Sequence, residues 1–146
     1  MPRPLLPTDP VRRALMQRVR QRRTRPEDLV AAGLRERGLH YRRNVKALPG
    51  SPDFANRRRG WAIFVNGCFW HHHKGCKRGT IPQRNRPFWV DKFAANRRRD
   101  ATKIRALRRA GLRVVVIWEC EALDPRRLAQ HLAVLANGRS APWPKG

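Results

Sequence analysis

The segment "RPFWVDKFAANRRRDATKIRALRRAGLRVVVIWEC", residues 86–120, joins a long polar stretch to a run of β-branched residues. In its first part, large apolar residues recur at helical spacing, which predicts a long helix that ends at Gly111. The buried stripe of this helix would consist of Trp89, Phe93, Ile104 and Leu107. The second part, residues 112–120, is almost continuously apolar, as expected of a strand buried on both faces. A long helix that leads directly into a buried strand indicates an α/β fold.

Upstream of this helix, residues 53–65 read "DFANRRRGWAIFV", in which two short runs flank a basic turn. This pattern predicts a β-hairpin, and we expect its second strand to lie beside the strand at 112–119. Further helices are predicted at residues 11–23, 24–38 and 125–136. The element order therefore predicts one three-layer α/β domain with a mixed sheet over residues 12–137, between a flexible arm at 1–11 and a disordered tail at 138–146.

The chain of 146 residues carries 34 Lys plus Arg against 10 Asp plus Glu, a formal net charge of +24. Such an excess repels itself in a compact chain, so we expect a polyanionic partner, with nucleic acid ahead of an acidic membrane. No run is long enough to span a bilayer, and no basic helix has an aromatic face. The N-terminus has too short an apolar stretch for a signal peptide, so we expect a cytoplasmic, nucleoid-associated protein.

Potential metal ligands are concentrated in "NGCFWHHHKGC", residues 66–76. Short-spaced thiolates and an imidazole, joined by one distant ligand, are typical of a closed structural zinc site. The set here would be Cys68, His73, Cys76 and Cys120. The alternatives are that Cys68 and Cys120 are ordinary core cysteines, or that the histidines bind metal only adventitiously.

Three further residues are candidates for catalysis. In an extended loop, neighbouring side chains alternate, so His71 could face a cleft as a general base while His73 binds the metal. The alternative role of His71 is support of the zinc site. Asp53 opens a strand after a Pro-Gly turn and could bind Mg²⁺, although its position alone favours an ordinary turn or cap aspartate. Glu27, at a predicted helix start, suits the helix dipole.

The adjacent aromatic residues Phe69 and Trp70 have two interpretations. Most aromatic side chains belong to a core. Beside a predicted zinc loop and a basic surface, however, these two could wedge between base pairs, as apolar side chains do in proteins that kink DNA.

Taken in order, "PGSPDF", "IFVNGCFWHHHKGC", "FWVDKFAANRRRD" and "RVVVIWEC" resemble the very short patch repair (Vsr) DNA mismatch endonucleases. The resemblance covers about residues 12–122. It implies a restriction-endonuclease-like fold with a structural Zn²⁺ and a catalytic Mg²⁺. It also implies a monomer that nicks double-stranded DNA on the 5′ side of the thymine in a T:G mismatch, with other mismatch-repair proteins as further partners.

The resemblance also implies roles for individual residues. Asp53 and the carbonyl of Val65 would bind Mg²⁺, His71 would be the base, and Glu27 falls at a family glutamate. The zinc ligands would be Cys68, His73, Cys76 and Cys120. Contacts with DNA would come from an intercalating Met16, the wedge Phe69 and Trp70, and the mismatch-reading pair Lys92 and Asn96. Arginines at 57–59 and 97–99 would neutralise the DNA backbone.

The chain departs from the family pattern in three places. Asn66 stands where some members have a second histidine. Ser51 replaces a basic residue that is often found in the Pro-Gly turn. Two residues, Lys74 and Gly75, separate the ligand histidine from the cysteine where other members have one, which leaves both His72 and His73 as candidate zinc ligands.

Overall fold

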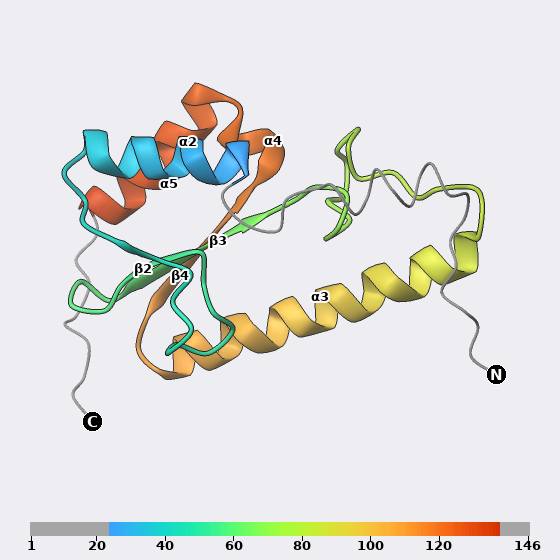
Figure 1. Ribbon diagram of the computed structural model, residues 1–146, viewed down its shortest axis with the longest axis horizontal. Helices are drawn as coiled ribbons and strands as arrows, with labels where there is room; N and C mark the ends of the chain where they lie inside the picture. The colour runs from blue at the N-terminus through green and yellow to red at the C-terminus, as the bar shows by residue number, and fades with distance from the viewer. Residues whose placement is uncertain (1–23, 138–146) are drawn as a thin grey trace.

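A four-stranded mixed sheet runs through the centre of the computed structural model, which describes residues 24–137 (Figure 1). The sheet order is β1-β2-β3-β4. The strands are β1 (Arg42–Arg43), β2 (Phe54–Asn56), β3 (Trp61–Asn66) and β4 (Arg113–Trp118). β1, β2 and β3 pair antiparallel, whereas β3 and β4 are parallel, with Trp61 opposite Arg113 and Asn66 opposite Trp118. The mixed sheet and the predicted hairpin are thereby confirmed.

Helices lie on both faces of the sheet and complete three layers (Figure 1). They are α2 (Arg25–Glu36), α3 (Arg86–Arg109), α4 (Glu119–Ala122) and α5 (Pro125–Asn137). α2, α4 and α5 cover one face, and the long α3 crosses the other and extends beyond the sheet. The hydroxyl of Thr24 accepts a hydrogen bond from the Glu27 amide and caps α2, as the helix-start pattern predicted.

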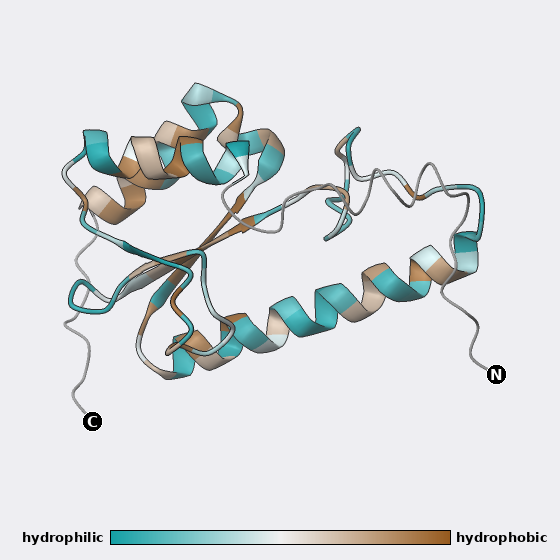
Figure 2. Ribbon diagram, viewed as in Figure 1, coloured by the Kyte–Doolittle hydropathy of each residue, from teal (hydrophilic) through white to brown (hydrophobic). Residues whose placement is uncertain are grey.

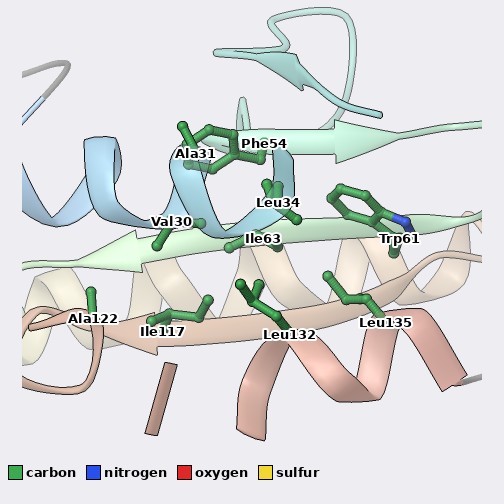
Figure 3. Packing of buried hydrophobic residues seen from close by; sticks show 10 residues of the cluster. All are labelled: Val30, Ala31, Leu34, Phe54, Trp61, Ile63, Ile117, Ala122, Leu132 and Leu135. Carbon is green, nitrogen blue, oxygen red and sulfur yellow. The ribbon is translucent and has the colours of Figure 1, made fainter. Parts of the chain in front are cut away.

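Two apolar clusters fill the spaces between the layers. On the α2/α5 side, Ile63 of β3 packs with Leu34, Ile117 and Leu132, all of them fully buried (Figure 3). On the α3 side, the alternate residues Ala62 and Phe64 pack with others from the turns and α3. Because successive strand residues point to opposite faces, β3 contributes to both clusters. Figure 2 shows the matching polarity of the helices: α3 is largely hydrophilic, with apolar residues concentrated near its ends.

Two expectations about burial were wrong. Residues 113–118 were expected to be buried on both faces, yet of β4 only Ile117 is buried. Within the described residues β4 pairs with β3 alone, so it forms a sheet edge and its other residues stay half-exposed. Ile104 of the predicted α3 stripe is also half-buried, whereas Trp89, Phe93 and Leu107 are buried.

Some predicted segments lie outside the described residues, namely the arm at 1–11, the helix at 11–23 with Met16, and the tail at 138–146. Within residues 24–137, no helix has the length and apolar character that crossing a membrane requires.

Candidate active site and metal centre

A tight turn places Asp53 at the start of β2. Gly50 (φ 76°) and Ser51 (φ 48°) both adopt left-handed backbone conformations, which reverse the chain before Pro52. A Cβ added at Gly50 would lie 2.7 Å from carbons of the Lys103 side chain, so this position requires glycine for space as well as for φ. The turn thereby brings β2, and with it Asp53, against Lys103 of α3.

The Asp53 carboxylate is held at the centre of the site. Its Oδ2 accepts a 2.7 Å hydrogen bond from the Val65 amide of β3. Burial raises the pKa of Asp53 from 3.8 to about 6; the Val65 hydrogen bond opposes this shift, and the charge of Glu27 adds to it. Glu27 is itself only 6% exposed and lies 3.6 Å from the guanidinium of Arg43. Two carboxylates are thus close enough to repel each other in a poorly solvated place.

A cleft of about 980 Å³ opens over this pair of carboxylates. The described residues that were predicted to act in catalysis, to form the wedge or to read the mismatch all line it: Glu27, Asp53, Val65, Phe69, Trp70, His71, Lys92 and Asn96. Of the arginines predicted to neutralise the DNA backbone, Arg99 lines the cleft, whereas those at 57–59, 97 and 98 do not. The buried Asn66 also lines the cleft. α2, α3, the end of β3, the turn before β2 and the loop after β3 therefore converge on one cavity, although their residues are dispersed over the sequence.

The loop after β3 is a compact turn, whereas we expected an extended stretch. The His71 amide donates to the Gly67 carbonyl (3.1 Å), and the His73 amide donates to the Cys68 carbonyl (2.9 Å). His72 has a positive φ of 49°. These bonds wind the chain, so the three adjacent histidines project in three different directions.

Each of these histidines has its own partner. Nδ1 of His71 lies 2.5 Å from Oδ2 of Asp100 on α3. The ring of His72 stacks on Phe93 at 5.2 Å between centroids, and burial together with the charge of Arg97 lowers its pKa. The ring of His73 stacks on Trp118 at 4.1 Å. The Asp100 contact leaves Nε2 of His71 as the ring nitrogen available to the cleft.

Four side chains gather into a potential metal centre on the other side of this loop, and they are Cys68, His73, Cys76 and Cys120. Their ligand atoms all lie within 4.8 Å of one another. Two ligands bound to one zinc ion stand at most about 4.6 Å apart, so the cluster has nearly the required size. His73 contributes Nδ1, at 3.6 Å from the Cys68 sulfur and 3.5 Å from the Cys120 sulfur. The geometry thus selects His73, rather than His72, as the candidate ligand.

We expected Cys120 to be the last residue of a strand, and this was wrong. It lies in the first turn of α4, immediately after β4. There its amide donates a 3.4 Å hydrogen bond to the Cys68 sulfur. Burial raises the pKa of the Cys68 thiol to about 12 and also raises that of Cys120. A metal would have to displace protons from these thiols, as metal binding by cysteine generally does.

The two residues of the predicted wedge are neither core nor freely exposed. Phe69 makes edge-to-face contacts with Trp89 at 5.4 Å and with Phe93 at 5.3 Å, which fixes its ring against α3. Trp70 lies 5.1 Å from Phe69, and its carbonyl accepts a 2.8 Å hydrogen bond from the amide group of Asn96. Both rings are half-buried and line the cleft.

Sequence reasoning missed two functional candidates on α3, Asp100 and Lys103. Both line the cleft, and the charge of Lys103 acts on Asp53. Their spacing contained the signal, because Lys92, Asn96 and Asp100 follow one another at intervals of four residues and share a helix face. Extending the predicted pair by one turn would have identified Asp100.

Comparison with known proteins places this site in a family. The family model described as "DNA mismatch endonuclease Vsr" matches residues 7–78. The DNA mismatch endonuclease Vsr of Escherichia coli is 38% identical over 131 residues, which cover 86% of this chain and 83% of that protein. The type II nicking enzyme V.XorIIP of Xanthomonas oryzae pv. oryzae is 46% identical over 121 residues, covering 83% and 88%. V.NmeAIP of Neisseria meningitidis, another type II nicking enzyme, is 37% identical over 107 residues, covering 73% and 76%. The chain therefore belongs to the Vsr family of DNA mismatch endonucleases.

Proposed function

We propose that this protein is a Mg²⁺-dependent endonuclease that nicks one DNA strand 5′ of the thymine in a T:G mismatch and so starts very short patch repair. Membership of the Vsr family makes the chain a DNA endonuclease. One observation carries the proposal furthest: a single cleft collects the carboxylates of Glu27 and Asp53, the imidazole of His71 and the aromatic pair Phe69 and Trp70. Such a cleft could hold a scissile phosphate next to a disturbed base pair.

The Asp53 environment fits a hard cation. Its pKa is raised to about 6 because burial and the nearby Glu27 both oppose its negative charge. A divalent ion would relieve that repulsion, and carboxylate and carbonyl oxygens are the ligands that Mg²⁺ prefers. Asp53 and the Val65 carbonyl would hold the ion, with Glu27 beside them. When bound, Mg²⁺ would supply Lewis-acid stabilisation of the charge that develops on the phosphate and the leaving oxygen.

His71 would take the proton from the attacking water. Asp100 holds Nδ1 at 2.5 Å, which fixes the ring orientation and favours the tautomer whose Nε2 is a free acceptor. The carboxylate would also stabilise the imidazolium that forms when Nε2 takes up the proton. Because Asn66 occupies the position of the second family histidine, one imidazole performs this task here.

The Cys68–His73–Cys76–Cys120 cluster would hold a structural Zn²⁺. Four ligands fill a tetrahedral shell, so the ion would leave no position open for a substrate. Its effect would be to connect the loop after β3 to α4, with Glu119 assisting by accepting a 3.2 Å hydrogen bond from the Cys68 amide. The loop that carries Phe69, Trp70 and His71 would then be fixed on both sides.

Selection of the mismatch would come from the cost of unstacking. A T:G wobble pair is easier to disrupt than a matched pair, and inserting an apolar wedge costs a few kcal/mol per base step. Phe69 and Trp70 are held against α3 and need little further ordering before insertion. Lys92 is exposed on the cleft wall and free to contact a base or phosphate, whereas Asn96 already holds Trp70.

The test is a nicking assay with Mg²⁺ on end-labelled duplexes that carry T:G or matched C:G at one position. We expect a single cut 5′ of the mismatched thymine in the T:G duplex. The variant Asp53→Ala should bind the mismatch but cut at no measurable rate, and Asp91→Ala, which removes an exposed carboxylate of α3, is the matched control. A fully active Asp53→Ala variant would exclude the proposed role of Asp53.

A second candidate is an endonuclease of the same chemistry with another target. The similarity to V.XorIIP supports this candidate, because that protein is named a type II nicking enzyme and is 46% identical to this chain. The assay separates the two, because equal cutting of the T:G and C:G duplexes would indicate a different specificity. Preferential binding of T:G without any cut would indicate a non-catalytic DNA-binding protein.

A further inference from the structure

Within residues 24–137, the excess of positive charge does not lie in the cleft. Among the described residues, the cleft lining contains four carboxylates, Glu27, Asp53, Asp100 and Glu119. It contains the same number of Lys and Arg side chains, which are Arg25, Lys92, Arg99 and Lys103. These charges cancel, although the whole chain carries +24. DNA held by these cleft residues therefore does not account for the excess that the described residues carry.

Part of that excess lies at the opposite end of β3. The hairpin turn at residues 57–60 precedes β3, and the α3–β4 turn precedes β4. The two turns adjoin, since the Arg113 amide donates a 2.8 Å hydrogen bond to the Gly60 carbonyl and Trp61 pairs with Arg113 in parallel register. The cleft residues Val65 and Gly67 lie at the other end of the same strand.

Five arginines lie on the first turn or directly before the second, where α3 ends, and form what we call the distal arginine patch: Arg57, Arg58, Arg59, Arg108 and Arg109. All five are exposed. Residues 54–65 and 101–118, which contain the two turns and the strands that follow, include no Asp or Glu. The potential at this edge is therefore strongly positive, and a counter-charge has to come from outside these segments.

We propose that the distal arginine patch binds the phosphate backbone of duplex DNA at a second segment, separate from the segment that is nicked. Charge complementarity identifies the partner: arginines on two turns suit the repeated phosphates of a duplex, and the patch has no apolar or aromatic residues that would read bases or enter a lipid layer. The contact would be independent of sequence and would weaken steeply with salt.

Distance separates this segment from the DNA in the cleft. A strand of six residues such as β3 spans about 20 Å, which corresponds to about six base pairs of duplex. A 10-bp duplex centred on the scissile phosphate reaches only about 17 Å to either side. It fills the cleft without reaching the patch, whereas a 40-bp duplex can occupy both.

Three double variants test the proposal, each removing two positive charges. Arg58→Gln/Arg59→Gln and Arg108→Gln/Arg109→Gln alter the patch from its two turns. Arg126→Gln/Arg127→Gln alters exposed residues at the start of α5 and controls for net charge. Binding of a matched 40-bp duplex would be followed by fluorescence anisotropy over a range of KCl concentrations without divalent cations, and thermal melts would verify folding.

For either patch variant, we expect the slope of log K against log salt to become shallower by about 2. The control should change it by less than half as much. Nicking of a hairpin-capped 10-bp T:G duplex should stay at the wild-type rate in all three variants. Three results would overturn the proposal: equal slope changes in all three variants, an unchanged slope in both patch variants, or a loss of 10-bp nicking as large as the loss of 40-bp binding.

Because anisotropy requires no cleavage, the binding comparison can be read even if the protein fails to nick T:G duplexes. Absence of nicking would contradict the proposed function alone. An unchanged salt slope in both patch variants would contradict the second DNA contact alone.

Discussion

Asp53 is buried next to Glu27, and this determines how the site responds to pH. Its pKa is about 6 in the fold against 3.8 for the free side chain, so the fold prefers the protonated form. The stabilisation from that form is complete below pH 3.8 and is lost as pH rises through about 6. Binding of a cation requires the opposite state, the carboxylate. Low pH thus stabilises the metal-free fold but disfavours cation binding at the proposed Mg²⁺ site.

Replacing Asp53 by Asn therefore has a pH-dependent effect on stability. Asn cannot ionise, so the variant escapes the cost of a buried carboxylate. Relative to wild type, its free energy of unfolding should rise by about 3 kcal/mol between pH 3.5 and pH 8. Urea titrations of both proteins at the two pH values, without divalent cations, would measure the difference. A difference that is constant with pH would show that Asp53 is solvated as in an open chain.

Asp100 should act on the reaction through His71. Asp100→Asn removes the charge that orients Nδ1, and we expect kcat for nicking to fall by about 100-fold or more while the affinity for T:G duplexes is unchanged. Asp91→Asn on the same helix removes the same charge from an exposed position and is the control. Single-turnover rates at saturating protein would separate chemistry from binding. An unchanged rate in Asp100→Asn would leave His71 without a functional partner on α3.

At the scale of elements, the loop between β3 and α3 carries three of the four candidate zinc ligands together with His71, the proposed general base. His73 and His72 are neighbours, yet only His73 reaches the cysteines. His73→Ala should lose bound zinc and lower the melting temperature by on the order of 10 °C. His72→Ala should retain the zinc of the wild type. Metal analysis of the purified proteins and thermal melts would check both, and equal zinc content in the two variants would refute the assignment.

Asn96 of α3 holds the backbone of Trp70, one of the two residues of the proposed aromatic wedge. The side-chain amide donates to the Trp70 carbonyl, and its oxygen accepts a 3.1 Å hydrogen bond from Arg99. Asn96→Ala should release Trp70 and reduce the ratio of T:G to C:G binding severalfold. Thr102→Ala, an exposed substitution on the same helix, should leave the ratio unchanged. Equilibrium binding to both duplexes measures this ratio. An unaltered ratio in Asn96→Ala would show that this residue has no part in mismatch selection.

Elements with a long periodic signal were predictable, and elements held by tertiary contacts were not. The 24 residues of α3 and the apolar run of β4 are evident in the sequence. β1, which comprises only two arginines, exists because β2 offers it a free edge, and no local pattern marks it. The exposure of β4 likewise depends on its place at the edge of the sheet, which its apolar sequence does not reveal.

The same distinction applies to the site. Cysteines and histidines can be grouped by residue type and spacing, and the structure brings the four predicted ligands together. Asp100 was not predicted as a site residue because it follows three arginines on a helix, a pattern typical of an ordinary surface residue. Its link to His71 spans 29 positions and depends on how α3 crosses the sheet.

At the scale of the whole molecule, one sheet supports two cores and one cleft. β3 contributes alternate residues to both apolar clusters, so a destabilising substitution in either cluster should also destabilise the other through this strand. Leu107 is fully buried on the α3 side and Leu132 on the α5 side. The cleft lies between these layers and depends on both.

Leu107→Ala and Leu132→Ala should each lower the free energy of unfolding by about 2 to 5 kcal/mol. Both variants should still unfold in one transition, because the clusters share β3. Val134→Ala, at a side chain that is 50% exposed, is the surface control and should change stability little. Denaturant titrations followed by tryptophan fluorescence and by circular dichroism would test this, and two separated transitions would show that the layers unfold independently.

The winding of the loop after Gly67 has a consequence for how such chains can change length during evolution. Between Cys68 and His73, the partner of each side chain depends on the number of residues that precede it in the turn. One inserted or deleted residue would therefore turn every later histidine toward a different neighbour. Selection should remove such changes. After His73 that constraint ends, because Lys74 and the left-handed Gly75 are free to lengthen the approach to Cys76. Length differences among relatives should therefore fall at residues 74–75, between the candidate ligands His73 and Cys76.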